Sequence, residues 1–473
     1  GFGVGGERRV EQVGTRAAAL GEVGDFGRAE PHVGGHPNGA EQPARPQALE
    51  QAVRVAAVYQ HAVAEAHAVG GERARGLLRQ LGDDLRRPRP HPVPPARRPA
   101  GPGTRAAGLA GSPVRRVGPA RPVPYHARSH EGGAALVVYF QGQKVVDIFT
   151  GKKSQNEAWQ ADTLAMCYST GKGILATLAH ILVSEGLLDY DKPIAKYWPE
   201  FAQNNKENIT LRHVLSHQTG LFDIRNLIET ATEMLDWQHM LDVVAAATPR
   251  FAAGQSYAYQ PLTYGWILGG VIEKAAKQPL SWLMQRYLVQ PLELDGAYFG
   301  TPTSELSRVA RLLERPKPAT SAKPHSKKDK QPRKASLSEK LLELSGQSPQ
   351  DFQDAMIPKG MRNFSFYSDE GLQAVIPAAN GVFTANSLAR VYAMLANKGQ
   401  WKNQQLIRPG VFEQLSSVQT TSRDRVMPIP MHWRLGYHRI LTMGKRAPHG
   451  FGHVGFNGSG AWCDSDRELS FAY

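Results

Sequence analysis

The chain has 473 residues, enough for two domains or one large domain, and a formal net charge of +14. About +6 of that charge lies in residues 1–120 and another +6 in residues 316–334, so the remainder is nearly neutral and is not expected to bind nucleic acid. The two cysteines, without a CxxC pair, imply neither a disulfide framework nor a zinc site, and the chain has no apolar run of 18 residues that would predict a membrane span.

The first part of the chain differs in composition from the rest. Residues 1–120 contain no Lys, Ile, Met, Trp or Cys, and runs such as RRPRPHPVPPARRPAGPG cannot bury a core. We predict that residues 1–125 are a low-complexity segment that is disordered or non-native: a genuine tail, a fusion, or a wrongly translated or assembled stretch. No secretory leader is visible, which favours the cytoplasm, although the chain opens on Gly and leaves the compartment open.

Residues 126–473 read as one folded domain with strands at both ends and helices between them. Alternating apolar residues from Gly133 to Gly151 predict two strands that turn at Gly142. This order predicts an α/β domain whose antiparallel sheet is built from both termini, flanked by helices, with a mostly helical subdomain inserted. The predicted helices are 209–221 (stopped at Gly220), 262–276, 280–288 and 387–397. A Lys-rich loop insertion is predicted at 316–334. Late strands are predicted at HWRLGYHRI, GHVGF and ELSFAY. Because ELSFAY ends within a strand pattern, we expect a C-terminally truncated domain.

The stretch CYSTGKGIL places Ser169 and Lys172 three residues apart where an apolar helical pattern begins. Residues at this spacing lie on one face of a helix, so the Lys172 amine can reach back toward the Ser169 hydroxyl. The plainer alternative is a helix cap followed by a surface lysine, and S-x-x-K alone does not decide between them.

Three further stretches favour chemistry at Ser169. Tyr259 lies in AGQSYAYQPLTYG, in a predicted loop before an apolar helix. GHVGFNGSG, residues 452–460, is a Gly-rich strand edge whose backbone can approach a substrate closely. The third is LSHQTGL, which follows a long amphipathic stretch.

Together these stretches resemble the serine β-lactamase and penicillin-binding-protein superfamily, and most of all its class C β-lactamase-like esterases, the family VIII carboxylesterases. The resemblance covers residues 133–473 without the Lys-rich insertion, and it implies a β-lactamase/transpeptidase-like fold. ITLRHVLSHQTGL and IPAANGVFTANSLARVYAMLAN also resemble family helices. The motif residues are Ser169 and Lys172 (S-x-x-K), Tyr259 (the Tyr of Y-x-N), and His453, Val454 and Gly455 (K-T-G, or a variant such as H-x-G).

Two departures from the family motifs bear on the substrate. Pro261 stands where a β-lactamase has the Asn of Y-x-N, and His453 stands where it has the Lys of K-T-G. Proline offers no side-chain hydrogen bond, and histidine is at most partly charged at neutral pH. An ester is therefore expected rather than a β-lactam. The chain has no G-x-S-x-G sequence, which argues against an α/β-hydrolase.

The pattern and the resemblance imply a mechanism. A serine hydroxyl needs a base, and Lys172 serves if burial lowers the pKa of its amine, while the helix N-terminus favours an alkoxide at Ser169. The resemblance makes Tyr259 the second proton-transfer group. It also assigns an oxyanion hole to the backbone amides of Ser169 and Phe456, and a substrate-lining role to His453, Val454 and Gly455. A packed aromatic remains the alternative for Tyr259, and a surface histidine on a strand edge for His453.

Other functions stay open at this stage. The chain could be a D-amino-acid peptidase or a weak β-lactamase, a catalytically inactive binding protein or misassembled fragment, or a nucleic-acid binder acting through its two basic segments. The expected partner is a small-molecule ester or amide, and the oligomeric state is not predicted. No cofactor is expected. His449 and His453 are four residues apart, but the intervening Gly450 and Gly452 argue against a helix that would align them on a metal.

Overall fold

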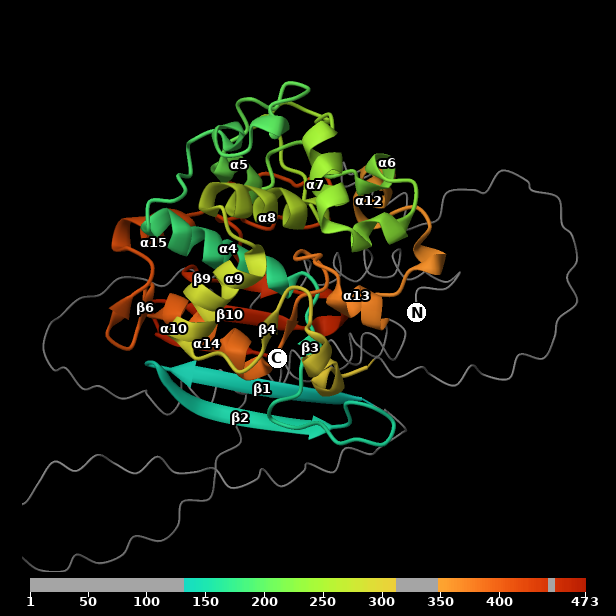
Figure 1. Cartoon of the computed structure of the whole chain (residues 1–473). Coiled ribbons are helices and arrows are strands. Elements are labelled where there is room, and N and C mark those ends of the chain that lie inside the picture. The colour runs from blue at the N-terminus through green and yellow to red at the C-terminus, as the bar shows by residue number, and fades with distance from the viewer. Residues whose placement is uncertain (1–131, 312–347, 441–446) are drawn as a thin grey trace, which may run out of the picture. The chain divides into compact units, whose positions relative to one another are not determined.

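The computed structural model describes residues 132–311, 348–440 and 447–473. Its largest sheet within these ranges is antiparallel and has six strands (Figure 1). The two ends of the predicted domain meet in this sheet, because the last strand pairs between the first strand and β10, as expected. Both the predicted low-complexity segment, 1–125, and the Lys-rich insertion, 316–334, lie outside the described residues. In spatial order the strands are β2 (Gln143–Gly151), β1 (Gly133–Phe140), β11 (Leu469–Ala472), β10 (Gly460–Asp464), β9 (Gly450–Val454) and β8 (His438–Arg439).

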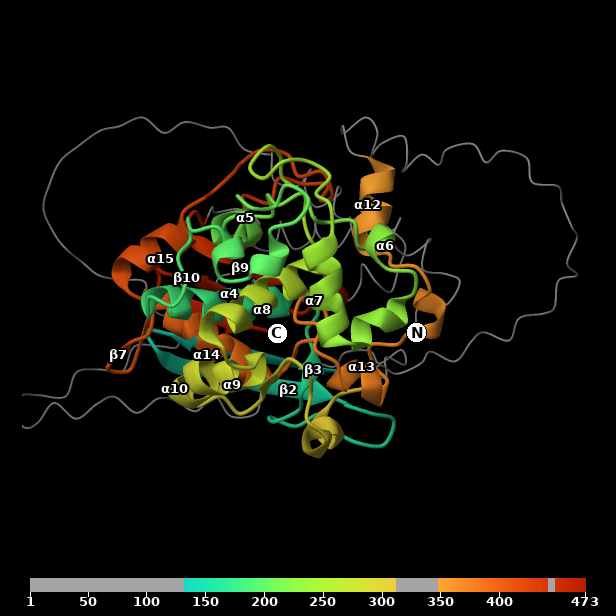
Figure 2. The same cartoon turned by 45° about the horizontal axis from the view of Figure 1, so that its top comes forward.

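Helices cover one face of this sheet and extend away from it into a mostly helical region. Helix α14 packs against β1, β10 and β11, and α4 packs against β9, α8 and α15. Residues 170–183 of α4 are all buried, so this helix runs through the centre of the core. Helix α12 lies beside α6 in both views (Figure 1, Figure 2). The α-helices are α4 (Thr170–Ser184), α5 (Leu211–Leu215), α6 (Ile224–Leu227), α7 (Trp237–Ala246), α8 (Thr263–Ala276), α9 (Leu280–Met284), α10 (Gln290–Leu292), α12 (Pro349–Met356), α13 (Asp369–Gln373), α14 (Ala385–Ala396) and α15 (Pro409–Ser416).

Several predicted elements are shorter in the structure. The helix expected over 209–221 is only α5, because the chain leaves the helical conformation at Ser216 and His217 takes a positive φ of 60°. The helix expected over 280–288 changes at Gln285 into a π-helical turn. Within the predicted strand HWRLGYHRI only His438–Arg439 (β8) pairs with another strand. The preceding residues are irregular, and the side chains of Trp433, Leu435 and Tyr437 are buried. The other small strands are β3 (Ala165–Met166), β5 (Val382–Phe383) and β4 (Ala297–Tyr298), which form one sheet, and the pair β6 (Gln400–Trp401) and β7 (Gln404–Gln405).

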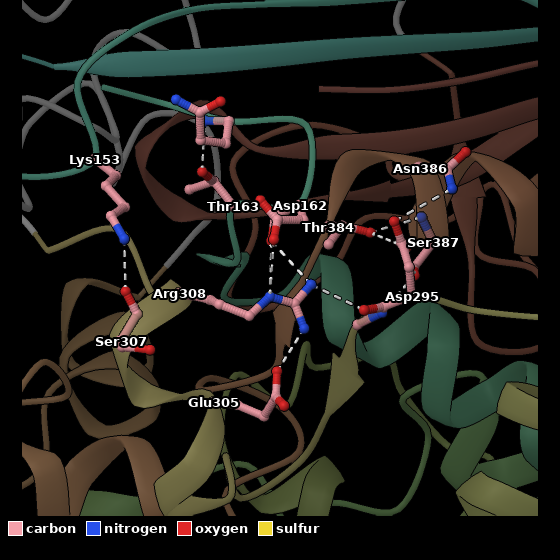
Figure 3. Close-up of polar contacts among 12 residues, drawn as sticks. Lys153, Asp162, Thr163, Asp295, Glu305, Ser307, Arg308, Thr384, Asn386 and Ser387 are labelled. Atoms are coloured by element: carbon pink, nitrogen blue, oxygen red, sulfur yellow. Dashed lines mark hydrogen bonds and ion pairs between the residues drawn. The ribbon is translucent and has the colours of Figure 1, made fainter. Parts of the chain in front are cut away.

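A polar network fixes the segment that leads into α4 (Figure 3). The Arg308 guanidinium donates to the carbonyl of Asp162 from Nε (3.1 Å) and Nη2 (2.9 Å), and Nη2 also donates to the carbonyl of Asp295 (2.9 Å). The Asp295 carboxylate accepts the hydroxyls of Thr384 (2.6 Å) and Ser387 (2.7 Å) at the start of α14. These bonds tie the chain just before β3 to β4 and α14, so the turn after β3 enters α4 from a fixed direction.

Candidate active site

Ser169 lies at the N-terminal end of α4, directly after a strained residue. Tyr168 has a φ of +46°, a left-handed conformation that is costly for a bulky side chain. The Tyr168 ring is held by edge contacts with Phe366 (6.0 Å between ring centroids) and Phe456 (5.5 Å). Ser169 is half-buried and makes no side-chain capping bond to the helix, so the simple cap interpretation does not hold. Its Oγ instead lies 2.9 Å from Lys172 Nζ and 2.9 Å from the Tyr259 hydroxyl.

Lys172 is fully buried, so it is not the surface lysine of the plainer alternative. Its Nζ lies 2.6 Å from the Pro261 carbonyl and 2.8 Å from the Ala378 carbonyl, in addition to Ser169. Burial lowers the pKa of the Lys172 amine well below its ordinary value of 10.5, because the low-dielectric interior disfavours the charged form. A neutral amine has two N–H groups and one lone pair. In the neutral form the two carbonyls accept both N–H groups and the lone pair is left for the Ser169 hydroxyl, whereas the ammonium donates to all three groups.

The two carbonyls around Lys172 are themselves held in place. Pro261 occupies the position of the motif asparagine, and here its backbone oxygen, not a side chain, contacts the amine. The Ala378 carbonyl belongs to a loop organised by buried Asn380. The Asn380 amide donates to the carbonyls of Gly371 (2.9 Å) and Ala374 (2.6 Å), and its oxygen accepts the amide of Ile376 (3.0 Å).

Tyr259 approaches Ser169 from the loop before α8. Its hydroxyl donates to Ser169 Oγ (2.9 Å), and burial raises the pKa of the phenol above its usual value of 10.0, so the hydroxyl stays protonated at neutral pH. The ring stacks on the Trp433 indole with a centroid separation of 5.4 Å and an interplanar angle of 10°. The edge of the His217 ring contacts both Tyr259 (5.0 Å) and Trp433 (4.3 Å).

Sequence reasoning missed three residues that surround Tyr259: His217, Asp424 and Trp433. Asp424 is buried, and its carboxylate accepts the Tyr259 backbone amide (3.0 Å) and the Trp433 indole N–H (2.9 Å). His217 lies in LSHQTGL, which the sequence did single out, but the positive φ that turns it toward Tyr259 has no local signal. Nothing near Asp424 or Trp433 in the sequence points to a tyrosine more than 160 residues away.

The end of β9 lies directly against the loop that carries Ser169. A Cβ added to Gly455 would be 2.1 Å from the Cys167 carbonyl oxygen and 2.9 Å from Thr170 Oγ1, so the backbones are in close contact. The Ser459 hydroxyl closes the contact by donating to the same Cys167 carbonyl (2.8 Å). Phe456 follows Gly455 immediately, which brings its backbone next to residues 167–170.

His453 is buried, with 2% of its surface exposed, so it is not the surface histidine of the alternative interpretation. Its Nδ1 contacts the Val454 carbonyl (2.9 Å), and its ring centroid is 6.3 Å from that of Tyr259 and 4.8 Å from that of His438. The Val454 amide donates to His438 Nε2 (3.2 Å). Burial lowers the pKa of His453 well below 6.5, so its imidazole is uncharged at neutral pH.

Within the described ranges, no group of three or more His, Cys, Asp or Glu residues is arranged to hold a metal ion. Cys167 and Cys463 are both free and buried. Among the helices of the described residues, none is long and apolar enough to cross a membrane.

The fold and this site define a class of protein. An antiparallel sheet built from both ends of a domain, with a serine, a lysine and a tyrosine gathered at the start of a central helix, belongs to the serine hydrolases of the β-lactamase and penicillin-binding-protein type. The sequence profile of the family described as Beta-lactamase matches residues 123–473, and the chain belongs to this family.

Named relatives and solved structures agree with this membership. The chain is 34% identical over 349 residues to the esterase/beta-lactamase LipL of Mycobacterium tuberculosis, across 72% of this chain and 76% of the relative. A penicillin-binding protein homologue from Caulobacter crescentus superposes with a TM-score of 0.58 at 31% identity, covering 72% of this chain and 86% of that structure. A family VIII carboxylesterase gives a TM-score of 0.60 at 28% identity with the same coverage.

Proposed function

We propose that this chain hydrolyses carboxylic esters through an acyl-enzyme formed on Ser169, with Lys172 as the base and Tyr259 as the second proton-transfer group. The observation that carries the proposal is the position of Ser169 Oγ, 2.9 Å from a buried amine and 2.9 Å from a buried phenol. Both distances allow direct proton transfer in the resting enzyme.

Acylation begins when neutral Lys172 takes the Ser169 proton while Oγ attacks the ester carbonyl carbon. The tetrahedral oxyanion is stabilised by the backbone amides of Ser169 and Phe456, which the contact at Gly455 keeps adjacent. Collapse breaks the bond to the leaving oxygen, which takes the Tyr259 proton and departs as the alcohol. The Tyr259 phenolate then recovers a proton from the Lys172 ammonium.

Deacylation uses the same groups in reverse. A water molecule gives its proton to the Tyr259–Lys172 pair and attacks the acyl carbon, the bond to Ser169 Oγ breaks, and Oγ regains a proton. The raised pKa of Tyr259 suits the acid role, because the phenol is protonated when the leaving group needs a proton.

An ester fits this site better than a β-lactam. The residue at the K-T-G position is a buried, uncharged histidine, which offers no full positive charge to a substrate carboxylate. The Asn side chain of Y-x-N is replaced by a proline whose carbonyl is engaged with Lys172. One solved structure is named a carboxylesterase, and one relative is named for both activities, as an esterase/beta-lactamase, so esterase activity stands in both names.

The test compares Ser169→Ala, Lys172→Ala and the parent chain in hydrolysis of p-nitrophenyl butyrate. We expect both substitutions to abolish measurable turnover, while Ser154→Ala, which removes an exposed hydroxyl bonded to Glu157, keeps the parental rate. A fluorophosphonate probe should label Ser169, as read by peptide mass spectrometry. Full hydrolysis by the Ser169→Ala protein, or labelling at another serine, refutes the proposal.

The alternative substrates are separated in the same preparation. Nitrocefin reports β-lactamase activity and a D-Ala-D-Ala peptide reports peptidase activity, each compared with p-nitrophenyl butyrate by kcat/KM. We expect the ester to exceed both. A larger kcat/KM for nitrocefin or the peptide would move the substrate assignment to that class and leave the Ser169 mechanism in place.

A further inference from the structure

We propose that Asp424 is a positioning residue for Tyr259: together with the Trp433 indole that it holds, it fixes the phenol at the distance needed to protonate the leaving alcohol. This inference rests on the proposed function and extends it to a residue that touches neither substrate nor Ser169. It starts from the contacts around one buried carboxylate.

The Asp424 side chain links the loop that carries Tyr259 to the residues that directly follow Asp424. Oδ1 accepts the amide of Tyr259 (3.0 Å) and the amides of Val426 (2.8 Å) and Met427 (3.0 Å). Oδ2 accepts the indole N–H of Trp433 (2.9 Å). The next residue reinforces this link, because the Arg425 amide donates to the Tyr257 carbonyl (2.8 Å). One carboxylate therefore holds both the backbone of Tyr259 and the aromatic ring on which Tyr259 stacks.

This arrangement controls the two ways in which the phenol can move. The hydrogen bond from the Tyr259 amide to Asp424 fixes the backbone of Tyr259. The Trp433 ring, at an interplanar angle of 10°, blocks one face of the phenol. The edge of the His217 ring contacts Tyr259 at 5.0 Å, and its Nδ1 accepts the Gln260 amide (3.3 Å). With the backbone and the ring both held, the hydroxyl stays at Ser169 Oγ.

The chemistry of the four donors requires a carboxylate. Asparagine at 424 can still accept the backbone amides through its oxygen, but its NH₂ group then faces the Trp433 indole N–H. Two donors face each other in a buried place, so the indole must shift and the stacked phenol loses its support. Asp424→Asn thus keeps the size of the residue and leaves Tyr259 in the chain, but it removes the acceptor of the Trp433 indole N–H.

The effect should depend on the leaving group. p-Nitrophenolate leaves without protonation, whereas an alkoxide requires a proton from Tyr259, and a positioned acid is worth roughly a hundredfold or more in rate. We expect Asp424→Asn to lower kcat/KM, which reports acylation and not the deacylation that both butyrate esters share, at least about tenfold more for ethyl butyrate than for p-nitrophenyl butyrate. Tyr259→Phe should show the same bias in stronger form.

Two controls separate positioning from folding. Asp464→Asn makes the same change at another buried aspartate, at the end of β10 that pairs with Gly450, and should lower the rates of both esters equally or not at all. Adding Trp433→Phe to Asp424→Asn removes the opposing donor while keeping an aromatic ring, so part of the ethyl butyrate rate should return.

The outcomes are distinct. Equal losses on both esters in Asp424→Asn, while Tyr259→Phe shows the leaving-group bias, overturn the positioning role and leave the proposed function standing. No bias in Tyr259→Phe refutes the Tyr259 acid and this inference together. Ethyl butyrate hydrolysis by Ser169→Ala at the parental rate refutes the proposed function itself.

Discussion

Substitution of Gly455 by alanine tests whether the end of β9 must lie against the Ser169 loop. Gly455 has φ −104° and ψ 161°, an extended conformation that alanine adopts without strain. Any effect is therefore steric. The added Cβ would lie 2.1 Å from the Cys167 carbonyl oxygen and 2.3 Å from Ser459 Oγ. The serine side chain can rotate away, but the carbonyl is backbone.

The size of the displacement follows from these contacts. Ordinary contact with a Cβ begins at 3.4 Å, so the Cys167 carbonyl and residue 455 must separate by about 1.3 Å. That movement carries the Phe456 amide away from Ser169. Misplacement of about 1 Å, or loss of one oxyanion donor, costs about a hundredfold in rate. We expect kcat for p-nitrophenyl butyrate to fall by about that factor, with a loss of about 1–3 kcal/mol in stability from overpacking.

The assay measures kcat together with thermal unfolding by circular dichroism, so that a folded but slow enzyme is distinguished from an unfolded one. Gly410→Ala is the matched control. Gly410 lies in the first turn of α15, a Cβ there would meet no atom within 4 Å, and its φ is not positive. This variant should keep parental kcat and stability or gain a little stability. A Gly455→Ala protein that melts cooperatively and retains parental kcat would refute the close contact and its catalytic role.

Two further predictions concern pH. Because burial lowers the pKa of Lys172 well below 10.5, kcat/KM should reach its plateau at a pH well below 10.5; a profile that rises only near pH 10 would show that the amine titrates like a free lysine. Burial also lowers the pKa of His438 from 6.5 to about 4. Between pH 6.5 and about pH 4 the imidazole is therefore protonated in the unfolded chain and neutral in the folded chain. The free energy of unfolding falls as the pH drops through this range. That shift corresponds to about 3 kcal/mol, and urea unfolding at pH 7 and pH 4 should show a smaller pH-dependent loss in His438→Gln than in the parent, whereas an equal loss in both would contradict the assignment.

Elements with strong local patterns could be predicted from the sequence. The β1–β2 hairpin followed from alternation around Gly142, which has a φ of +71°, and α8 and α14 followed from apolar spacing. Element lengths were less predictable where tertiary contacts override the pattern. The helix expected to reach Gly220 ends at Leu215, and the ring of His217 packs in the aromatic cluster around Tyr259.

The candidate site shows the same division. The i, i+3 spacing of Ser169 and Lys172 placed the two side chains together, because helix geometry alone fixes that distance. The remaining partners of Lys172 are backbone carbonyls, and a carbonyl carries no residue-type signature in a sequence. Asp424 was invisible for a related reason: a buried aspartate that accepts amides from a distant loop looks, in sequence, like any surface acid.

The neutral histidine at 453 and the buried acid at 424 act in the same direction on Tyr259. A lysine at the motif position would place a positive charge close to the phenol and lower its pKa, whereas uncharged His453 does not. Burial is the main cause of the raised Tyr259 pKa, and the negative charge of Asp424 adds to it. Both residues therefore favour the protonated phenol, the form that can donate a proton. In the proposed mechanism, proton removal from Ser169 then depends on Lys172, whose own pKa burial has lowered. The uncharged His453 and the Pro261 carbonyl engaged with Lys172 are thus consistent with the proposed mechanism, in which Lys172 is the base, Tyr259 is the acid and position 453 offers no charge to an anionic substrate.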